Sequence, residues 1–238
     1  IGILRHDGSC FFTIKLHRRP YDPYHKNYHA QYRKVYMAVW KNSIVSYIDL
    51  IGIQEKIAKG NSLATDTMRK MHNLVENAMN YGMRSHDHCY IWNDSVLLMS
   101  NLDSPYRQTD VNEVILEVDN LKREIDFICG SYAISVKGKV FPEEIPPQAA
   151  IFDGQITEQP RTVRLKASSY AMGNCFKIEA KLGKKLKKPW YIDSRIATKL
   201  NSQQKHKRHV VSMLPDNKER EVYVYEDYLW GGASTTNT

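Results

Sequence analysis

The sequence predicts an α+β domain in which helices pack against a mixed β-sheet. Short apolar runs with strand character alternate with longer segments whose apolar residues recur at helical spacing. Hydrophobic residues make up 42% of the 238 residues, which is enough for a sizeable core. No apolar run reaches the roughly 18 residues that a membrane-spanning helix needs, and no signal segment is evident. We therefore expect a globular domain with no membrane partner.

The net charge and the cysteines indicate which partners and which cellular compartment suit this domain. The formal net charge is +8, and most of the excess lies in KLGKKLKK (181–188) and KHKRH (205–209). Such an excess favours an anionic partner, either a nucleic acid or the phosphates of a nucleotide, although a solvated basic face explains both runs equally simply. Isolated cysteines without a CxxC pair are typical of free thiols in the cytoplasm; they are Cys10, Cys89, Cys129 and Cys175.

The first half of the chain predicts these elements in order. Residues 1–34 form an N-terminal extension, in which CFFTIKLH is a strand and a Tyr-, His- and Pro-rich arm follows. The segment KVYMAVWKNSIVSYIDLIGI holds two apolar bursts, and the second is a core strand that ends at Asp49. Residues 63–81 predict a helix. Short apolar runs on both sides of Asn93–Asp94 predict a tight β-hairpin, because these turn residues tolerate positive φ.

The second half begins with the clearest amphipathic helix, DVNEVILEVDNLKREIDFIC, which stops at Gly130. SYAISVKGKVF predicts a strand with a kink or turn at Gly138, and EEIPPQAAIFDGQITEQP a loop with a short element. SSYAMGNCFKIEAKLGKKL predicts a third helix, PWYIDSRI a strand, and the tail a hairpin around residues 215–217 before a frayed end. We expect a main domain over 35–200 and C-terminal strands with a disordered tail over 201–238.

Asp49 and Asp94 are the candidate functional residues. Each lies where an apolar strand ends or turns, and neither has a Lys or Arg beside it in sequence. A carboxylate in such a place costs several kcal/mol unless it is paired, protonated or bound to a cation. If the two strands are neighbours, the carboxylates repel each other unless a divalent ion such as Mg²⁺ or Mn²⁺ lies between them. The alternative is an ordinary strand-end residue and an ordinary turn residue.

The segments around these aspartates resemble the two metal-binding segments of class III nucleotidyl cyclases. YIDLIGI matches the strand end with the first aspartate, and YIWNDSVLLMS the hairpin with the second. SYAISVKGKV lies in the place of that family's Gly-rich strand, and SYAMGNCFKIEAKL in that of its Asn/Arg helix, so the resemblance covers about residues 36–200. It implies a ferredoxin-like class III cyclase domain with an N-terminal arm and a C-terminal hairpin.

The departures from the family pattern point to one branch. Ile53 stands where the family usually has Phe, and Asn93 where it usually has Gly. Gly173 and Lys177 occupy the places of the transition-state Asn and Arg. The helix segment AMGNCFKIE is similar to that of the bacterial pyrimidine (uridylate/cytidylate) cyclases of Pycsar anti-phage defence, and we take this branch as the best match.

The resemblance assigns roles to individual residues. Asp49 and Asp94 would bind two divalent ions, Mn²⁺ or Mg²⁺, and the backbone carbonyl of Leu50 would complete one metal site. Tyr90 falls where purine-specific branches place the residue that reads the base, although tyrosine is also a common strand residue. A cation must also meet the triphosphate, and the candidates are Arg123, Lys137, Lys139 and Lys177.

The implied function is a pyrimidine nucleotide cyclase. It would convert UTP, or less readily CTP, to the 3′,5′-cyclic nucleotide (cyclic UMP) and pyrophosphate, as a homodimer. A separate effector would sense the product in antiviral defence. Two alternatives stay open: a catalytically degenerate cyclase domain that acts as a nucleotide-binding sensor, and a basic nucleic-acid-binding protein. The presence of both aspartates favours the enzyme over the sensor. Neither basic run is interleaved with aromatic residues in the manner of a base-stacking platform, so we do not expect nucleic acid as a partner.

Overall fold

The computed structural model describes residues 3–4, 10–11, 40–60, 62–142, 151–152, 155–156, 167–201, 206–227 and 229–230. The chain divides into two compact units, residues 1–38 and 39–238. In the first unit, β1 (Ile3–Leu4) pairs antiparallel with β2 (Cys10–Phe11). Most of the expected N-terminal arm lies outside the described residues, and the expected boundaries at residues 34 and 200 stay predictions.

The second unit is built on one mixed sheet with the strand order β11-β12-β10-β6-β3-β5-β4. β3 is central and antiparallel to both β5 and β6, whereas β10 runs parallel to β6. This sheet confirms the predicted α+β class. Its strands are β3 (Trp40–Leu50), β4 (His88–Trp92), β5 (Ser95–Asn101), β6 (Ser131–Pro142), β10 (Trp190–Asp193), β11 (His206–Ser212) and β12 (Glu219–Tyr225).

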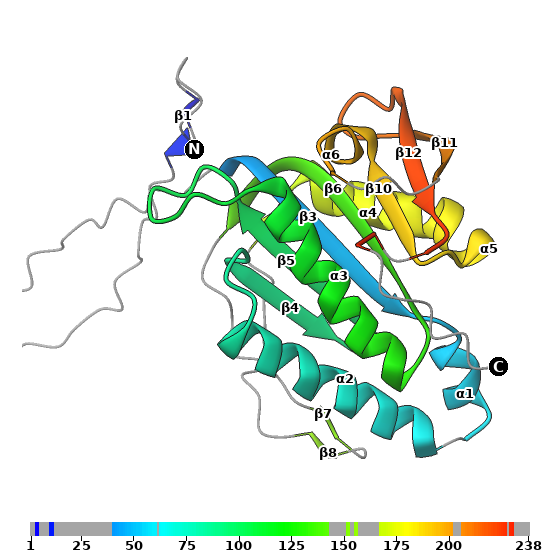
Figure 1. The fold of residues 1–238 in the computed structure, drawn as a ribbon. Coiled ribbons are helices and arrows are strands. Elements are labelled where there is room, and N and C mark those ends of the chain that lie inside the picture. Colours follow the sequence, from blue (N-terminus) through cyan, green and yellow to red (C-terminus); the bar gives the residue numbers. More distant parts are fainter. Residues whose placement is uncertain are drawn as a thin grey trace, which may run out of the picture. The chain divides into compact units, whose positions relative to one another are not determined.

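Helices cover both faces of the sheet (Figure 1). On one face, α2 (Ser62–Tyr81) and α3 (Val111–Ile128) bury their apolar stripes. On the other, α4 (Tyr170–Ile178) packs across β6 and β3 and continues without a break into the π-helical turn η1 (Glu179–Gly183) and α5 (Lys184–Leu186). The sheet therefore separates two apolar cores. None of the described helices has the length and apolar character that a membrane span requires.

Several predicted elements are confirmed, although β3 begins at Trp40, before the second apolar burst that predicted it. They are the strand through Asp49, the helix at 63–81, both hairpins and the amphipathic helix that ends before Gly130. Of the expected kink or turn at Gly138, the turn is wrong, because β6 continues through that residue. The pairing of β6 with β3 shifts register beside it, between Trp40 and Ser43, as expected for a kink. Gly138 instead permits close packing: an added Cβ would lie 2.7 Å from the Cβ of Ala171 on α4.

A few short elements were not predicted. α1 (Ile53–Ala58) and α6 (Ser194–Ala197) are too short for their apolar periodicity to stand out from the sequence. Within the predicted loop after β6, β7 (Ile151–Phe152) pairs with β8 (Gln155–Ile156), which is the expected short element. β9 (Ala167–Ser168) pairs with the end of β6. The predicted frayed end at 231–238 lies outside the described residues.

Candidate active site

The site begins with the alternation of side chains along β3. Ile44, Ile48 and Leu50 enter the core beneath α2 and α3, whereas Val45 and Tyr47 enter the core beneath α4. Because successive residues of a strand point to opposite faces, Asp49 lies on the α4 face. It pairs directly with Ser95 of β5 and with Tyr132 of β6. The central position of β3 thus places one carboxylate between two strands that both carry hydroxyl side chains.

Three hydroxyl groups donate hydrogen bonds to the Asp49 carboxylate. Ser95 donates to Oδ1 at 2.6 Å and Tyr47 to the same atom at 3.1 Å. Tyr132 donates to Oδ2 at 3.0 Å. Burial raises the pKa of Asp49, and the nearby charge of Asp94 raises it further, against the opposing effect of these hydrogen bonds. The carboxylate is therefore held in a defined orientation at some electrostatic cost.

Asp94 lies beside Asp49 because of the tight β4–β5 turn. Asn93 adopts φ 49°, as expected for such a turn. The backbone oxygen of Asp94 accepts from the N–H of Leu50 at 3.1 Å, which fixes the turn against the end of β3. Asp94 is 8% exposed, and its carboxylate accepts from the Asn93 side chain at 3.1 Å. The structure thus brings Asp49, Leu50 and Asp94 together at one end of the sheet.

A third carboxylate reaches this cluster from the helix. The phenol of Tyr132 lies 3.1 Å from Oε1 of Glu179, the first residue of the π-helical turn. Burial, followed by the charges of Asp49 and Glu179, raises the pKa of Tyr132, so the phenol stays a hydrogen-bond donor. Lys184 lies 3.8 Å from the same oxygen of Glu179. No pattern in the sequence predicted that Glu179 lies near Asp49.

Tyr90 is buried in the core on the α4 face of the sheet. Its register partner on β5 is Leu97, which pairs in turn with Tyr47 on β3. Tyr90 is 7% exposed and belongs to the core beneath α4. It shares a sheet face with Asp49, but most of its surface contacts other residues of the chain. Its role in reading a base stays a prediction.

Two of the predicted phosphate-binding cations lie away from Asp49, one on α3 and the other on β6. Arg123 forms an ion pair of 2.8 Å with the buried Asp119 on α3, across the sheet from Asp49. Lys137 pairs with Ile44 near the other end of β3, and burial followed by contact with Lys199 lowers its pKa. It lies five residues along β6 from Tyr132, or about 17 Å at the usual rise of a strand.

The other two predicted cations are also directed elsewhere. Lys177 donates to the side chain of Asn217 in the C-terminal hairpin at 2.8 Å. Lys139 is exposed and lies still farther along β6 than Lys137. Within one chain, the structure brings none of the four predicted cations to the two aspartates. Their contact with a triphosphate stays a prediction.

The donor set around Asp49 and Asp94 fits a divalent cation that shares its ligands with a substrate. In the part of the chain that the structure describes, neither carboxylate forms an ion pair with Lys, Arg or His. No group of three or more His, Cys, Asp or Glu side chains among these residues could hold a metal by itself. Mg²⁺ is commonly bound by one or two carboxylates together with phosphate oxygens and water, which is the arrangement that these two aspartates allow.

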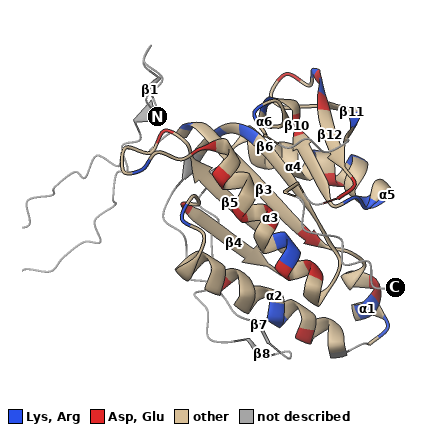
Figure 2. Ribbon diagram, viewed as in Figure 1, with Lys and Arg blue, Asp and Glu red and all other residues tan. Residues whose placement is uncertain are grey.

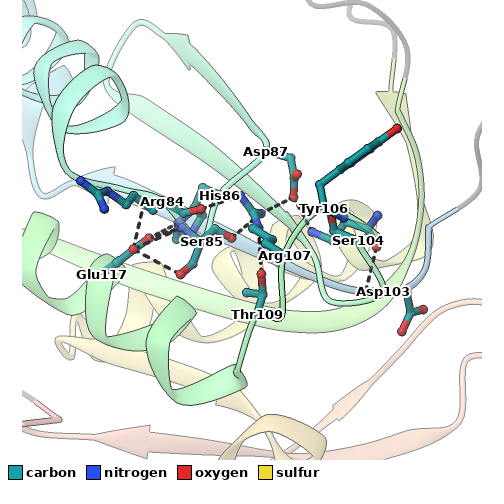
Figure 3. Close-up of polar contacts among 11 residues, drawn as sticks. Arg84, Ser85, His86, Asp87, Asp103, Ser104, Tyr106, Arg107, Thr109 and Glu117 are labelled. Carbon is teal, nitrogen blue, oxygen red and sulfur yellow. Dashed lines mark hydrogen bonds and ion pairs between the residues drawn. The ribbon is translucent and has the colours of Figure 1, made fainter.

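A second polar cluster lies at the far end of β5 (Figure 3). Arg107 donates to the backbone of Ser85 at 2.9 Å and to Asp87 at 2.6 Å. Glu117 on α3 accepts from the backbone of Ser85 and from His86. These contacts fix the loop between α2 and β4. An open cavity of about 500 Å³ adjoins the cluster, lined by Leu102, Asp103, Ser104, Arg107, Gln108, Thr109, Asp110 and Glu113.

The two basic runs lie together in space. Lys181 on η1 donates to the backbone oxygen of Val210 on β11 at 3.2 Å, which joins the helix of the first run to the strand of the second. Figure 2 shows Lys and Arg on α5 and on β11. Residues 177–226 contain 13 Lys and Arg against 6 Asp and Glu, so they account for most of the positive excess. This basic surface (Lys181–Lys188 and His206–Arg208) adjoins the carboxylate cluster only through the contact of Lys184 with Glu179 among the described residues.

Comparisons with known proteins match this architecture at the level of fold. No family model matches the chain, and no curated protein matches it. Among solved structures, a bacterial light-regulated adenylyl cyclase is similar with a TM-score of 0.51 and 10% identity, over 81% of this chain and 93% of that one.

Two further solved structures agree. The adenylyl cyclase CyaB from P. aeruginosa has a TM-score of 0.52 and 10% identity, over 80% and 97% of the two chains. The catalytic core of a rhodopsin-guanylyl cyclase with converted specificity, in complex with ATPalphaS, has a TM-score of 0.53 and 9% identity, over 80% and 98%. The main unit of the chain therefore has the fold of class III nucleotidyl cyclase domains.

Proposed function

We propose that the chain is a nucleotidyl cyclase that uses two divalent cations held by Asp49 and Asp94, with the backbone carbonyl of Leu50 completing one metal site. The observation that carries this proposal is the convergence of the two carboxylates within a cyclase fold. The charge of Asp94 adds to the cost of ionising Asp49, and no ion pair with a described residue offsets that cost. A binding-only site has little need of two such groups.

The reaction follows from this donor set. The ribose 3′-oxygen forms a bond to the α-phosphorus while the bond from that phosphorus to the β-phosphate oxygen breaks, and pyrophosphate leaves. Bound Mg²⁺ or Mn²⁺ would help to deprotonate the 3′-hydroxyl and offset charge on the leaving group. The chain's own hydroxyl groups keep the Asp49 carboxylate in place: Tyr47 and Ser95 at one oxygen and Tyr132 at the other.

The finer assignment rests on the resemblance to the pyrimidine branch. We infer UTP as the preferred substrate, CTP as the less preferred one, and cyclic UMP as a second messenger in antiviral defence. We infer a cytoplasmic homodimer, because cations that lie far from Asp49 in one chain could then reach the triphosphate from the other. A separate effector would sense the cyclic nucleotide.

A product assay tests this function directly. The purified protein is incubated with ATP, GTP, CTP or UTP and Mn²⁺, and the products are identified by mass. We expect cyclic UMP from wild type and no cyclic product from Asp49→Asn or Asp94→Asn. Cyclic AMP or cyclic GMP as the main product would overturn the pyrimidine assignment alone. Nucleotide binding without any cyclic product would favour the degenerate sensor. The lack of a side chain at Gly173, in the place of the family's transition-state Asn, also favours the sensor.

A second candidate function is favoured by the basic surface. Its cations come from two runs that the contact between Lys181 and Val210 brings together. If this surface binds polynucleotides, affinity for a labelled duplex should fall steeply with salt, and Lys184→Glu with Lys185→Glu should abolish it. Lys56→Glu with Lys59→Glu, on α1 and just after it, is the matched control. If both double variants bind the duplex with equal affinity, the basic surface is not where polynucleotides bind.

A further inference from the structure

Three aromatic side chains form a cluster beside the carboxylates on the α4 face of the sheet. This aromatic cluster consists of Tyr47 on β3, Trp92 on β4 and Phe176 on α4. The ring centroids of Tyr47 and Phe176 are 5.4 Å apart and nearly perpendicular. Those of Tyr47 and Trp92 are 6.1 Å apart, and those of Trp92 and Phe176 are 6.3 Å apart. These separations are typical of packed aromatic pairs, so each ring holds the others in place.

The cluster has a buried base and an exposed edge. Tyr47 is 6% exposed, whereas Trp92 is 37% and Phe176 41% exposed. A tryptophan whose ring is fixed by two neighbours and yet meets solvent offers a preformed flat apolar surface. Little side-chain entropy would be lost when a planar ligand stacks on it, because its two side-chain torsions are already constrained.

The register of the sheet places this surface at the candidate active site. Trp92 pairs with Ser95, and Ser95 pairs with Asp49, so the three residues form one row across β4, β5 and β3. Ser95 also donates to Asp49 at 2.6 Å. Two strand spacings put Trp92 about 10 Å from Asp49 on the same face. That separation is comparable to the distance between the base and the phosphates of a nucleotide.

Tyr90 differs from Trp92 in exposure. It lies two residues earlier on the same strand and the same face, but it is 7% exposed and belongs to the core. A base that approaches this end of the sheet would meet Trp92 before Tyr90. The accessible ring is therefore that of Trp92, next to the Asn93–Asp94 turn, and not that of Tyr90, four residues before Asp94.

We propose that Trp92 is the residue on which the base of the bound nucleotide stacks, with Phe176 and Tyr47 holding its ring in place. This inference rests on the proposed function, since it takes the phosphates to lie at Asp49 and Asp94. Every base has a π-face, so stacking adds affinity for any nucleoside and selects among bases only weakly. Trp92 thus contributes to substrate affinity, and base choice must come from polar groups elsewhere.

The test compares a ligand that has a base with one that has none. Binding of UTP and of inorganic tripolyphosphate is measured by calorimetry in Ca²⁺, which limits turnover, for wild type and Trp92→Ala. We expect Trp92→Ala to weaken UTP binding about tenfold and to leave tripolyphosphate binding unchanged. Trp92→Phe should restore most of the UTP affinity. Phe127→Ala is the matched control, because Phe127 is 94% exposed and lies on α3, across the sheet.

Other results would overturn the inference. Equal losses for UTP and tripolyphosphate would mean that Trp92 supports the phosphate site, and unchanged UTP binding would mean that no base stacks there. If Trp92→Ala converts a dimer into a monomer in sedimentation, the ring belongs to a contact between two copies. In each of these cases the cyclase proposal can stand. Wild type that neither binds nor turns over any nucleotide would remove both proposals.

Discussion

The phenol oxygen of Tyr132 lies 3.0 Å from Oδ2 of Asp49, its direct cross-strand partner. The same oxygen lies 3.1 Å from Oε1 of Glu179 on the helix that crosses this face. A phenol carries one proton, so it can donate to only one of these carboxylates at a time. The other carboxylate then faces an oxygen lone pair. A cation bound at Asp49 would relieve this conflict, and Tyr132 would then link the proposed metal site to η1.

Removing the Tyr132 hydroxyl should weaken metal binding. Its hydrogen bond favours the ionised form of Asp49 and so opposes the rise in pKa that burial causes. Tyr132→Phe should therefore raise the pKa of Asp49 further. We expect Mn²⁺ affinity to fall about tenfold, as is usual when a group that orients a ligand is lost. The acidic limb of the activity profile should shift to higher pH. Calorimetry with Mn²⁺ checks the first effect, and unchanged affinity would contradict it. Tyr106→Phe, at a fully solvated ring, is the control.

Metal removal should reverse the order of stability of wild type and Asp49→Asn. Mn²⁺ at about 100 times its Kd should stabilise wild type by roughly 2.7 kcal/mol, or about 5–10 °C in Tm, and the variant far less. In EDTA, which removes the metal, Asp49→Asn should be more stable than wild type. The pKa of Asp49 is raised, chiefly by burial and also by Asp94, so its ionised form destabilises the fold as pH rises.

The advantage of metal-free Asp49→Asn should therefore grow with pH and disappear in acid, where the wild-type carboxyl is protonated. Thermal melting in EDTA across a pH series measures this difference. A variant that melts below wild type at alkaline pH would show that the ionised carboxylate stabilises the fold, contrary to the prediction.

Two glycines near α4 should respond differently to an added methyl group. At Gly138 on β6, a Cβ would lie 2.7 Å from the Cβ of Ala171 and 3.4 Å from its backbone, which cannot move without shifting the helix. At Gly173, the close atom is the tip of the flexible Leu214 side chain, at 2.8 Å. We expect Gly138→Ala to cost about 1–3 kcal/mol and Gly173→Ala much less. Urea denaturation of both variants tests the ranking, and equal losses would argue against close packing of α4 on β6.

Patterns that are local in sequence predicted much of the fold. Alternation located the strand through Asp49, helical spacing located α2 and α3, and the pair Asn93–Asp94 located the turn that brings the two aspartates together. A tight turn at 93–94 also implies that residues 92 and 95 are opposite each other. The pairing of Trp92 with Ser95 could therefore be predicted from the sequence.

Contacts between distant segments were not predictable in this way. Tyr132 and Glu179 reach Asp49 through the pairing of β6 with β3 and the packing of α4, and no spacing within the sequence encodes either. For the same reason, the sequence could not choose among the four candidate cations for the triphosphate. A charge count locates positive residues, but it does not reveal that Arg123 is paired with a buried carboxylate or that Lys177 reaches toward the C-terminal hairpin.

The pair formed by His86 and Glu117 should make the protein less stable in acid (Figure 3). Burial lowers the pKa of His86 below its ordinary 6.5, so the folded protein keeps the ring neutral while it lies 3.0 Å from Glu117. Burial alone would raise the pKa of Glu117, but hydrogen bonds from His86 and the backbone of Ser85 lower it below its ordinary 4.5.

Both shifts act in the same direction on stability. Below pH 6.5 an unfolded chain protonates His86 more readily than the folded one does, and at lower pH the same holds for Glu117, so folding stability falls as pH drops through these ranges. Urea denaturation of wild type between about pH 5 and 8 should show this decline. His86→Gln, which cannot titrate, should flatten its upper part, whereas His209→Gln on β11 should not. Equal slopes for wild type and His86→Gln would mean that another group governs the loss of stability.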